Sequence, residues 1–317
     1  MASIDYKDLS GSEVTLCEDE NPFQPLINAS NDDPVQLQSR YTVHRTSRNE
    51  QQRRIILDPN FGGWTLDPIL CKLDGPDRDP NFQDDRFCIT FWGRPPQHIR
   101  EIVDMVQEEL RSVAPTLWFM PLDRLHITTL EVIHSTTESN MESIVSTLLR
   151  DGVAERIANY TATHRARLIK PMISFDTAAM ALSFVPAAGE GLADGDATSD
   201  AYTYHHLRRD VYSEVRKAEV IPAQRYVVPS AHLTVARFIT QEGFKDDRGQ
   251  VDHYRVRQLV DKIDSLNDRL RAQFWPTEAG QIPKGGEWIV GQEKGLDFRK
   301  GRLWYGGGET VLLGRGF

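Results

Sequence analysis

Apolar residues in the middle of the chain follow two alternating periods, one typical of strands and one typical of helices. The aromatic and apolar run over 86–92 predicts a strand that ends at a glycine. Two prolines follow, and apolar residues then recur at helical spacing over 99–113, which predicts a helix. Two more strands are expected over 117–121 and 125–132.

A similar order of elements follows in the second half of the chain. Ser139 and Glu142 have the spacing of a capping box and predict the start of a helix. A Gly-, Ala- and Asp-rich loop is expected over 187–200. The other expected elements are helices to about residue 164 and over 202–220 and 256–270, and strands near 168–175, 178–185, 231–239, 287–291, 296–305 and 310–313. This order predicts an α+β fold with two lobes.

The N-terminal part of the chain has a different character. Residues 1–40 are rich in Asp, Glu, Asn and Ser with little periodicity, so we expect a flexible acidic extension. Residues 41–84 contain several turn signals and predict an irregular arm packed on the core. The bilobal domain is then expected over 85–317.

Two strand-like segments that lie far apart share one pattern. His126 and Thr128 stand two residues apart in the first segment, and His232 and Thr234 in the second, each pair with apolar flanks. Side chains at positions i and i+2 of a strand point to the same face. Each segment can therefore offer an imidazole and a hydroxyl to one cleft, a set suited to proton transfer and to holding a phosphate.

The tripeptide His-x-Thr alone is weak support for a site. The nine histidines of the chain would give about one match by chance, whereas matches begin at His44, His126, His134 and His232. Of these, His126 and His232 lie in apolar, β-prone sequence. One such strand is more often a buried structural element whose histidine bonds to a backbone carbonyl, but a matched pair, one in each predicted lobe, favours a functional site.

Composition limits the classes of partner. The net charge of −9 argues against tight binding of long nucleic acid, yet a nucleotide or a short RNA end needs only a local positive pocket. The three cysteines are widely spaced and are expected to be free thiols in a reducing compartment. No secretory signal or membrane-spanning run is evident, so we expect a protein of the cytoplasm or the nucleus with no membrane partner. We also expect it to be a monomer.

The two motifs resemble those of the 2H phosphoesterase superfamily, which is named for two His-x-Ser/Thr motifs. That family includes 2′,3′-cyclic nucleotide phosphodiesterases, RNA cyclic phosphodiesterases called 2′-5′ ligases, 2′-5′-oligoadenylate phosphodiesterases and the exonuclease that trims U6 RNA. The resemblance covers about residues 86–315. It implies pseudo-symmetric lobes whose antiparallel sheets line a central cleft, with helices outside.

The resemblance also implies a reaction that needs no metal or other cofactor. By this analogy His126 is the acid, His232 is the base, and Thr128 and Thr234 hold the phosphate, although the two histidines exchange roles if the reaction runs in the opposite sense. The implied activity is hydrolysis of a 2′,3′-cyclic nucleotide or of a phosphodiester at an RNA end.

Strand parity and aromatic character add candidate substrate contacts. Arg124 shares the predicted face of His126, where it could touch phosphate or equally be an edge arginine paired with an acid, and Ser230 shares the face of His232. Arg237 has the opposite parity from His232, so we expect a structural or surface charge there unless a bulge intervenes. Aromatic side chains that offer a surface for base stacking are Trp92, Trp118, Tyr204 and Tyr226.

Other signals are weaker, and two further functions stay open. His205-His206 lacks a carboxylate partner at ligand spacing, so we expect no metal site. The fold could instead serve acid–base chemistry on a small molecule that is not a nucleotide, or it could bind a nucleotide or RNA end without catalysis.

Overall fold

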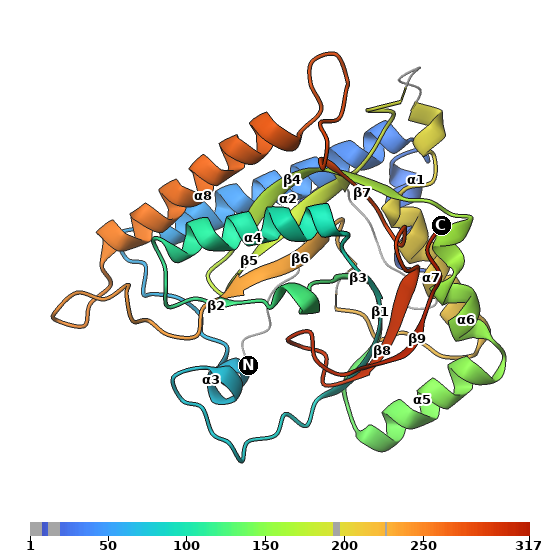
Figure 1. Cartoon of the computed structure of the whole chain (residues 1–317), viewed down its shortest axis with the longest axis horizontal. Coiled ribbons are helices and arrows are strands. Elements are labelled where there is room, and N and C mark those ends of the chain that lie inside the picture. Colours follow the sequence, from blue (N-terminus) through green and yellow to red (C-terminus); the bar gives the residue numbers. More distant parts are fainter. Residues whose placement is uncertain (1–7, 12–19, 193–196, 226) are drawn as a thin grey trace.

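Figure 1 shows the computed structural model of the chain. The structure describes residues 8–11, 20–192, 197–225 and 227–317. Two antiparallel sheets form its centre, and helices cover their outer sides. The predicted α+β class with two antiparallel sheets is confirmed.

The first sheet has the strand order β3-β1-β8-β9. Its strands are β1 (Phe87–Gly93), β3 (Ile127–Thr136), β8 (Leu296–Gly301) and β9 (Glu309–Leu313). The helices that pack on it are α5 (Glu138–Arg150), α6 (Val153–Ala158) and α7 (Tyr204–Lys217). The chain thus returns at its C-terminal end to complete a sheet that begins with β1.

The second sheet has the order β2-β6-β5-β4-β7. Its strands are β2 (Trp118–Phe119), β4 (Arg167–Phe175), β5 (Ala179–Pro186), β6 (Ala231–Arg237) and β7 (Glu287–Ile289). The helices that pack on it are α2 (Pro34–Ile56), α4 (Gln97–Arg111) and α8 (His253–Phe274). The two predicted motif segments therefore belong to different sheets.

The apolar patterns located most elements to within a few residues, but two local predictions are wrong. Helix α5 begins at Glu138, because the side chain of Thr137 accepts the capping hydrogen bond from the backbone N–H of Asn140. Ser139 lies inside the helix and caps nothing. The strand expected over 125–132 begins only at Ile127, and a 3₁₀ turn, η1 (Leu122–Arg124), precedes the first motif.

The N-terminal region is more regular than the sequence predicted. Helix α2 runs without interruption to Ile56. A short helix precedes it in the sequence, α1 (Gln24–Ala29), and another follows it, α3 (Pro68–Asp74). Phe23, Leu37 and Tyr41 are buried. The predictions of a flexible extension up to residue 40 and of an irregular arm after it are therefore wrong for these segments. The division into three domains stays a prediction.

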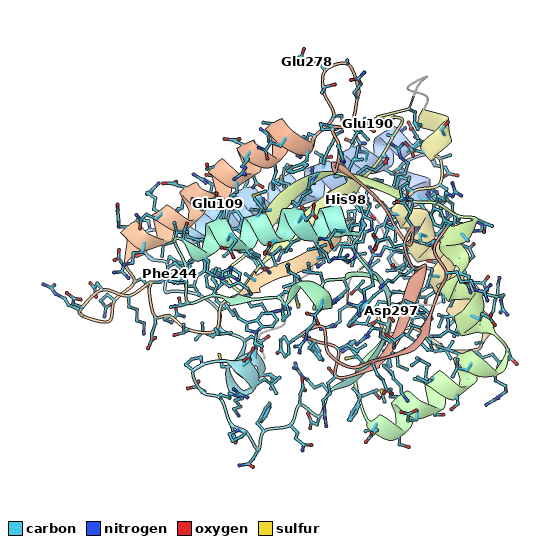
Figure 2. The ribbon with its side chains drawn as sticks, viewed as in Figure 1. His98, Glu109, Glu190, Phe244, Glu278 and Asp297 are labelled. Atoms are coloured by element: carbon cyan, nitrogen blue, oxygen red, sulfur yellow. The ribbon has the colours of Figure 1, made fainter. Side chains whose placement is uncertain are left out.

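Helix α2 escaped prediction because it is held by polar contacts and a few large side chains rather than by an apolar stripe. Tyr41 shares a hydrogen bond of 2.9 Å with Nδ1 of His205. Gln38 donates to Oε1 of Glu190, which lies close to α2 in Figure 2, at 2.9 Å. Asn49 donates to the backbone carbonyl of Ile173 on β4 at 2.9 Å. These contacts join distant parts of the chain and leave little periodic signal.

The 3₁₀ turns η2 (Tyr160–Ala162) and η3 (Ala197–Asp200) connect the longer elements. Cys71 and Cys88 are buried free thiols, as predicted, whereas Cys17 lies outside the described residues. None of the helices found in the described ranges combines the length and apolar character needed to cross a bilayer.

Candidate active site

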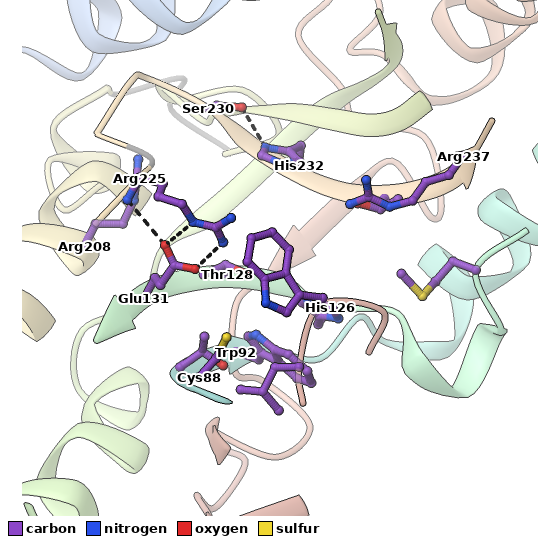
Figure 3. Close-up of a pocket in the computed structure, with 15 residues that line it drawn as sticks. Cys88, Trp92, His126, Thr128, Glu131, Arg208, Arg225, Ser230, His232 and Arg237 are labelled. Carbon is purple, nitrogen blue, oxygen red and sulfur yellow. Dashed lines mark hydrogen bonds and ion pairs between the residues drawn. The ribbon is translucent and has the colours of Figure 1, made fainter. Parts of the chain in front are cut away.

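A pocket of about 90 Å³ lies where the two sheets face each other, and Figure 3 shows its lining. Strands β1 and β3 supply one wall and β6 supplies the other. The residues that line it are Cys88, Thr90, Trp92, Met120, His126, Thr128, Glu131, Arg208, Arg225, Ser230, His232, Thr234, Arg237, Leu303 and Trp304. Both predicted His-Thr pairs are thus brought to one pocket from opposite sheets.

His126 precedes β3 and is held on two sides. Its Nδ1 lies 2.8 Å from the backbone carbonyl of Arg124, so Nδ1 carries the proton and donates it. The ring is stacked on the indole of Trp92, with centroids 3.7 Å apart and planes at 15°. These contacts fix the ring and make Nε2 the proton acceptor of the neutral imidazole.

His232 lies on β6 and is oriented by its own strand. Its Nδ1 lies 2.8 Å from the hydroxyl oxygen of Ser230, two residues earlier and on the same face of the strand (Figure 3). This is the parity that the sequence predicted for Ser230.

Both motif strands carry a bulge directly after the motif threonine. On β3 the partner of Thr128 is Trp92, and the partner of Leu130 is Phe91, so Thr129 is the extra residue. On β6 the partners of Thr234 and Ala236 are the adjacent residues Ala181 and Met180, so Val235 is the extra residue. A bulge resets the alternation of side chains between the two faces of a strand.

The bulges bring two charged side chains into the pocket at equivalent places. Glu131 and Arg237 each lie five positions after a motif histidine, and both line the pocket. In an unbroken strand that odd spacing would put them on the opposite face. The bulge that the sequence interpretation of Arg237 allowed for is present, so Arg237 lines the pocket while it also pairs with Asp67 at 3.7 Å.

The pocket carries more positive than negative side chains. Arg208, Arg225 and Arg237 line it, and Glu131 supplies the carboxylate of the lining, while Arg237 also lies 3.7 Å from Asp67. Arg225 binds the Glu131 carboxylate through Nε at 2.9 Å and through a second guanidinium nitrogen, and its guanidinium lies 4.0 Å from the ring centroid of Trp304. The local positive pocket that a nucleotide would require is thus present in a protein of net charge −9.

Both histidines are poised in the neutral form. Burial lowers the pKa of His126 to about 3; the Arg124 carbonyl opposes this, while Arg94 and Arg299 lower the pKa further. Burial likewise lowers the pKa of His232 to about 4, with further lowering by Arg208, Arg48 and Arg237. An anion bound between the rings would offset these positive charges and raise both pKa values.

Several predicted substrate contacts lie elsewhere. The side chain of Arg124 is exposed on the 3₁₀ turn and does not line the pocket, because the strand parity assumed for it does not extend to that turn. Trp118 is buried outside the pocket and donates to Asp74 at 2.9 Å. Tyr204 is fully buried and donates to the backbone carbonyl of Thr128 at 3.0 Å, so it supports the strand from behind. Tyr226 lies outside the described residues.

Trp92 lines the pocket but is not a free stacking surface. Its side chain is 1% exposed, and His126 covers one face of the ring. Arg94 and Arg299 also lie near the ring, each 4.9 Å from the centroid. Trp92 therefore supports the imidazole of His126 and does not accept a base.

Some pocket residues carried no usable signal in the sequence. Arg208 comes from α7, Arg225 from the segment that follows it, and Trp304 from the connection between β8 and β9. Their approach depends on how distant elements meet. The alternation of side chains along β1 could have predicted Thr90 as a lining residue, since Thr90 shares a face with Trp92.

The arrangement is suited to moving two protons across a bound anion. Within the described ranges, no group of three or more His, Cys, Asp or Glu side chains is placed to hold a metal ion. The polar groups around the two imidazoles are hydroxyls and guanidinium groups, which bind anionic oxygens.

No family model matches the sequence, and no curated protein is similar to it at a significant level. Among solved structures, Kluyveromyces marxianus Usb1 with uridine monophosphate has a TM-score of 0.34 and 13% identity, covering 72% of this chain and 97% of that chain. A second structure of the same Usb1 has a TM-score of 0.33 and 14% identity, covering 69% of this chain and 94% of that chain.

A conserved protein of unknown function from Agrobacterium tumefaciens has a TM-score of 0.39 and 10% identity, covering 78% of this chain and 99% of that chain. At such scores and identities these similarities support no inference about chemistry. The functional interpretation therefore depends on the residues of the pocket.

Proposed function

We propose that the protein is a metal-independent phosphodiesterase of the 2H type, which opens a 2′,3′-cyclic nucleotide phosphate or cleaves a phosphodiester at an RNA end. The observation that carries the proposal is the meeting of two oriented imidazoles from opposite sheets in one positively charged pocket. Each imidazole has its motif threonine beside it on the same wall.

In the proposed reaction one imidazole removes a proton and the other supplies one. His232 takes a proton from water, whose oxygen attacks phosphorus, and His126 gives its Nε2 proton to the leaving ribose oxygen as the P–O bond breaks. Thr128, Thr234 and Arg237 hold the non-bridging oxygens. Release of the product and exchange of protons with solvent restore the starting state.

The assignment of His126 as the acid follows the family resemblance. Burial leaves its pKa, at about 3, below that of His232, at about 4. The Arg124 carbonyl accepts from Nδ1 of His126 and favours the charged ring, raising its pKa against the effect of burial. Because both pKa values are low in the free protein, the acid becomes protonated only as the anionic substrate binds. Substrate charge therefore creates the state that reacts.

The test is turnover of the four nucleoside 2′,3′-cyclic phosphates and of a short RNA end in the presence of EDTA. His126→Ala or His232→Ala should each reduce kcat by about 10²-fold or more, since general acid–base groups typically contribute 10²–10⁴-fold. His134→Ala is the matched control, because His134 begins another His-x-Thr match on β3 but does not line the pocket.

Two results would contradict the proposal. Turnover that disappears in EDTA, or that survives both histidine substitutions, excludes a two-histidine mechanism. Nucleotide binding without turnover, unaffected by either substitution, would instead indicate a non-catalytic binding module, and neither binding nor turnover would indicate chemistry on another small molecule.

A further inference from the structure

A second hollow of about 130 Å³ adjoins the active-site pocket on the side of His232. We call it the α2 hollow, because α2 forms its outer wall. The two cavities share Ser230, His232, Thr234 and Arg237. The remaining lining residues are His44, Arg45, Arg48, Ser174, Phe175, Asp176, Ala178, Ala179, Met180, Ala181, Ser183 and Val228.

The hollow exists because small side chains continue the active face of the second sheet. Ser183 pairs with His232, and Ala181 pairs with Thr234, so these β5 residues lie on the same face as the motif. Ser174 on β4 pairs in turn with Ala181. Larger side chains there would fill the space between the sheet and α2.

Arg45 on α2 is a buried cation that has no carboxylate partner among the described residues. Its side chain lines the hollow although the residue is only 5% exposed. Nη1 donates to the backbone carbonyls of Lys170 at 2.7 Å and Ser183 at 3.3 Å, whereas Nε and Nη2 have no hydrogen-bond partner among the residues described. Burial and the charge of Arg271 lower its pKa to about 9, so it remains charged at neutral pH.

Arg48 is on the next turn of the same helix and also lines the hollow. It pairs with Asp176 at 2.8 Å, and both side chains are 22% exposed, so the pair is reachable from solvent. His44 is occupied on its far side by Asp8 and the backbone N–H of Leu9. Arg48 is balanced by Asp176 and Arg237 lies 3.7 Å from Asp67, so the net positive charge of the hollow comes from Arg45.

We propose that the α2 hollow binds a second phosphate of the substrate, next to the phosphate that reacts between His126 and His232. This inference rests on the proposed function and specifies its substrate class: a nucleotide carrying two phosphates, such as an RNA end of two or more nucleotides, rather than a nucleoside cyclic monophosphate. The two cavities have similar volumes, about 90 and 130 Å³, and each has room for a phosphate group beside the shared side chains of His232 and Thr234.

The first experiment measures equilibrium binding by calorimetry. The probes are a nucleoside 3′,5′-bisphosphate, the corresponding 3′- and 5′-monophosphates, and a dinucleotide that carries an internal phosphodiester and a 3′-phosphate. We expect the ligands with two phosphates to bind roughly 10- to 100-fold more tightly than the better monophosphate, as expected for charge-assisted contacts. The bisphosphate and the dinucleotide distinguish a terminal phosphate from an internal one.

Two substitutions should move this preference in opposite directions. Arg48→Ala should reduce it to about 2-fold or less, because it removes a cation and leaves the charge of Asp176 uncompensated. Asp176→Asn should increase it, because Arg48 is released while the amide oxygen still accepts from the backbone N–H groups of Ala178 and Ala179. A purely structural role would weaken binding in both variants. Arg54→Ala, on the exposed side of α2, is the control and should change nothing.

The ratio of affinities also removes an indirect effect. Arg48 and Asp176 both act on the pKa of His232, but every probe carries a phosphate for that site, so this contribution cancels. No preference for two phosphates in the wild-type protein, no nucleotide binding at all, or a preference unchanged by both substitutions would overturn the inference.

The second experiment separates this inference from the proposed function. It compares turnover of a nucleoside 2′,3′-cyclic phosphate with that of a dinucleotide ending in the same cyclic phosphate. Equal kcat/KM values, both abolished by His232→Ala, would leave the phosphodiesterase proposal standing and overturn the α2 hollow as a phosphate site. A binding preference without turnover of either compound would do the reverse.

Discussion

Binding of an anion in the active-site pocket should be coupled to proton uptake. Sulfate is a suitable probe because its own charge does not change between pH 5 and pH 8. In the free protein His232 has a pKa of about 4, so it is neutral at pH 7. A sulfate oxygen in contact with the ring would reverse the effect of the surrounding arginines and favour the imidazolium.

The size of the coupling follows from the geometry of contact. One unit charge at about 4 Å and an effective dielectric constant near 20 contributes about 4 kcal/mol, or about 3 pKa units. The pKa of His232 would then rise from about 4 to roughly 7 in the complex. By linkage, sulfate should bind about 50-fold more tightly at pH 5 than at pH 7, with uptake of about 0.9 proton at pH 6.

Calorimetry in two buffers of different ionisation enthalpy measures both quantities. His232→Asn and His126→Asn should each reduce the pH dependence, whereas His134→Asn should leave it unchanged. Affinity that is constant from pH 5 to pH 7, with no proton uptake, would refute the argument that two neutral imidazoles face the anion.

Three other predictions test the surroundings of the pocket. Arg237→Met should lower kcat/KM for a cyclic phosphate by about 10- to 100-fold, the loss expected for a charge-assisted contact, and unchanged kinetics would show that the bulge on β6 does not deliver Arg237 to the substrate. Gly93→Ala should lower the free energy of unfolding in urea by about 1–3 kcal/mol, because the added Cβ would lie 2.8 Å from Cγ2 of Ile127, and wild-type stability would contradict this packing. Burial lowers the pKa of His205 to about 3, so the unfolded chain binds this proton first, and His205 should contribute about 2 kcal/mol to a loss of stability between pH 7 and pH 5 that His126 and His232 share. Urea titrations should find less of this loss in His205→Gln, and an equal loss in both proteins would exclude His205 as its source.

The sequence alone identified the elements that depend on local pattern. Apolar runs located β1 and β5, which are largely buried on both faces, and helical periodicity located α4 and α8, each of which buries one stripe. The same reasoning identified the two His-Thr pairs and the place of Ser230, since parity over two residues is a property of the strand. These predictions needed no knowledge of which elements meet.

Helix α2 shows where local pattern was insufficient. Its buried residues include His44 and Arg45, whose burial depends on partners from β4, β5 and the N-terminal segment. A polar helix of this kind cannot be distinguished from an exposed arm by its own sequence. The hydrophobic periodicity of the sequence therefore could not predict that α2 forms a wall of the α2 hollow.

Within the site, the two bulges separate the side chains that strand parity predicts from those that only the paired strands place. The chain itself determined that His126 with Thr128, and His232 with Thr234, each share a face, because the two-residue repeat holds over that short distance. Only the tertiary structure decided that Glu131 and Arg237 join them, that Arg124 does not, and that both walls close on one pocket. The physical reason is that a bulge arises from the pairing of a strand with its neighbour, and a pocket arises from the meeting of two sheets, so neither is encoded in the order of residues along one segment.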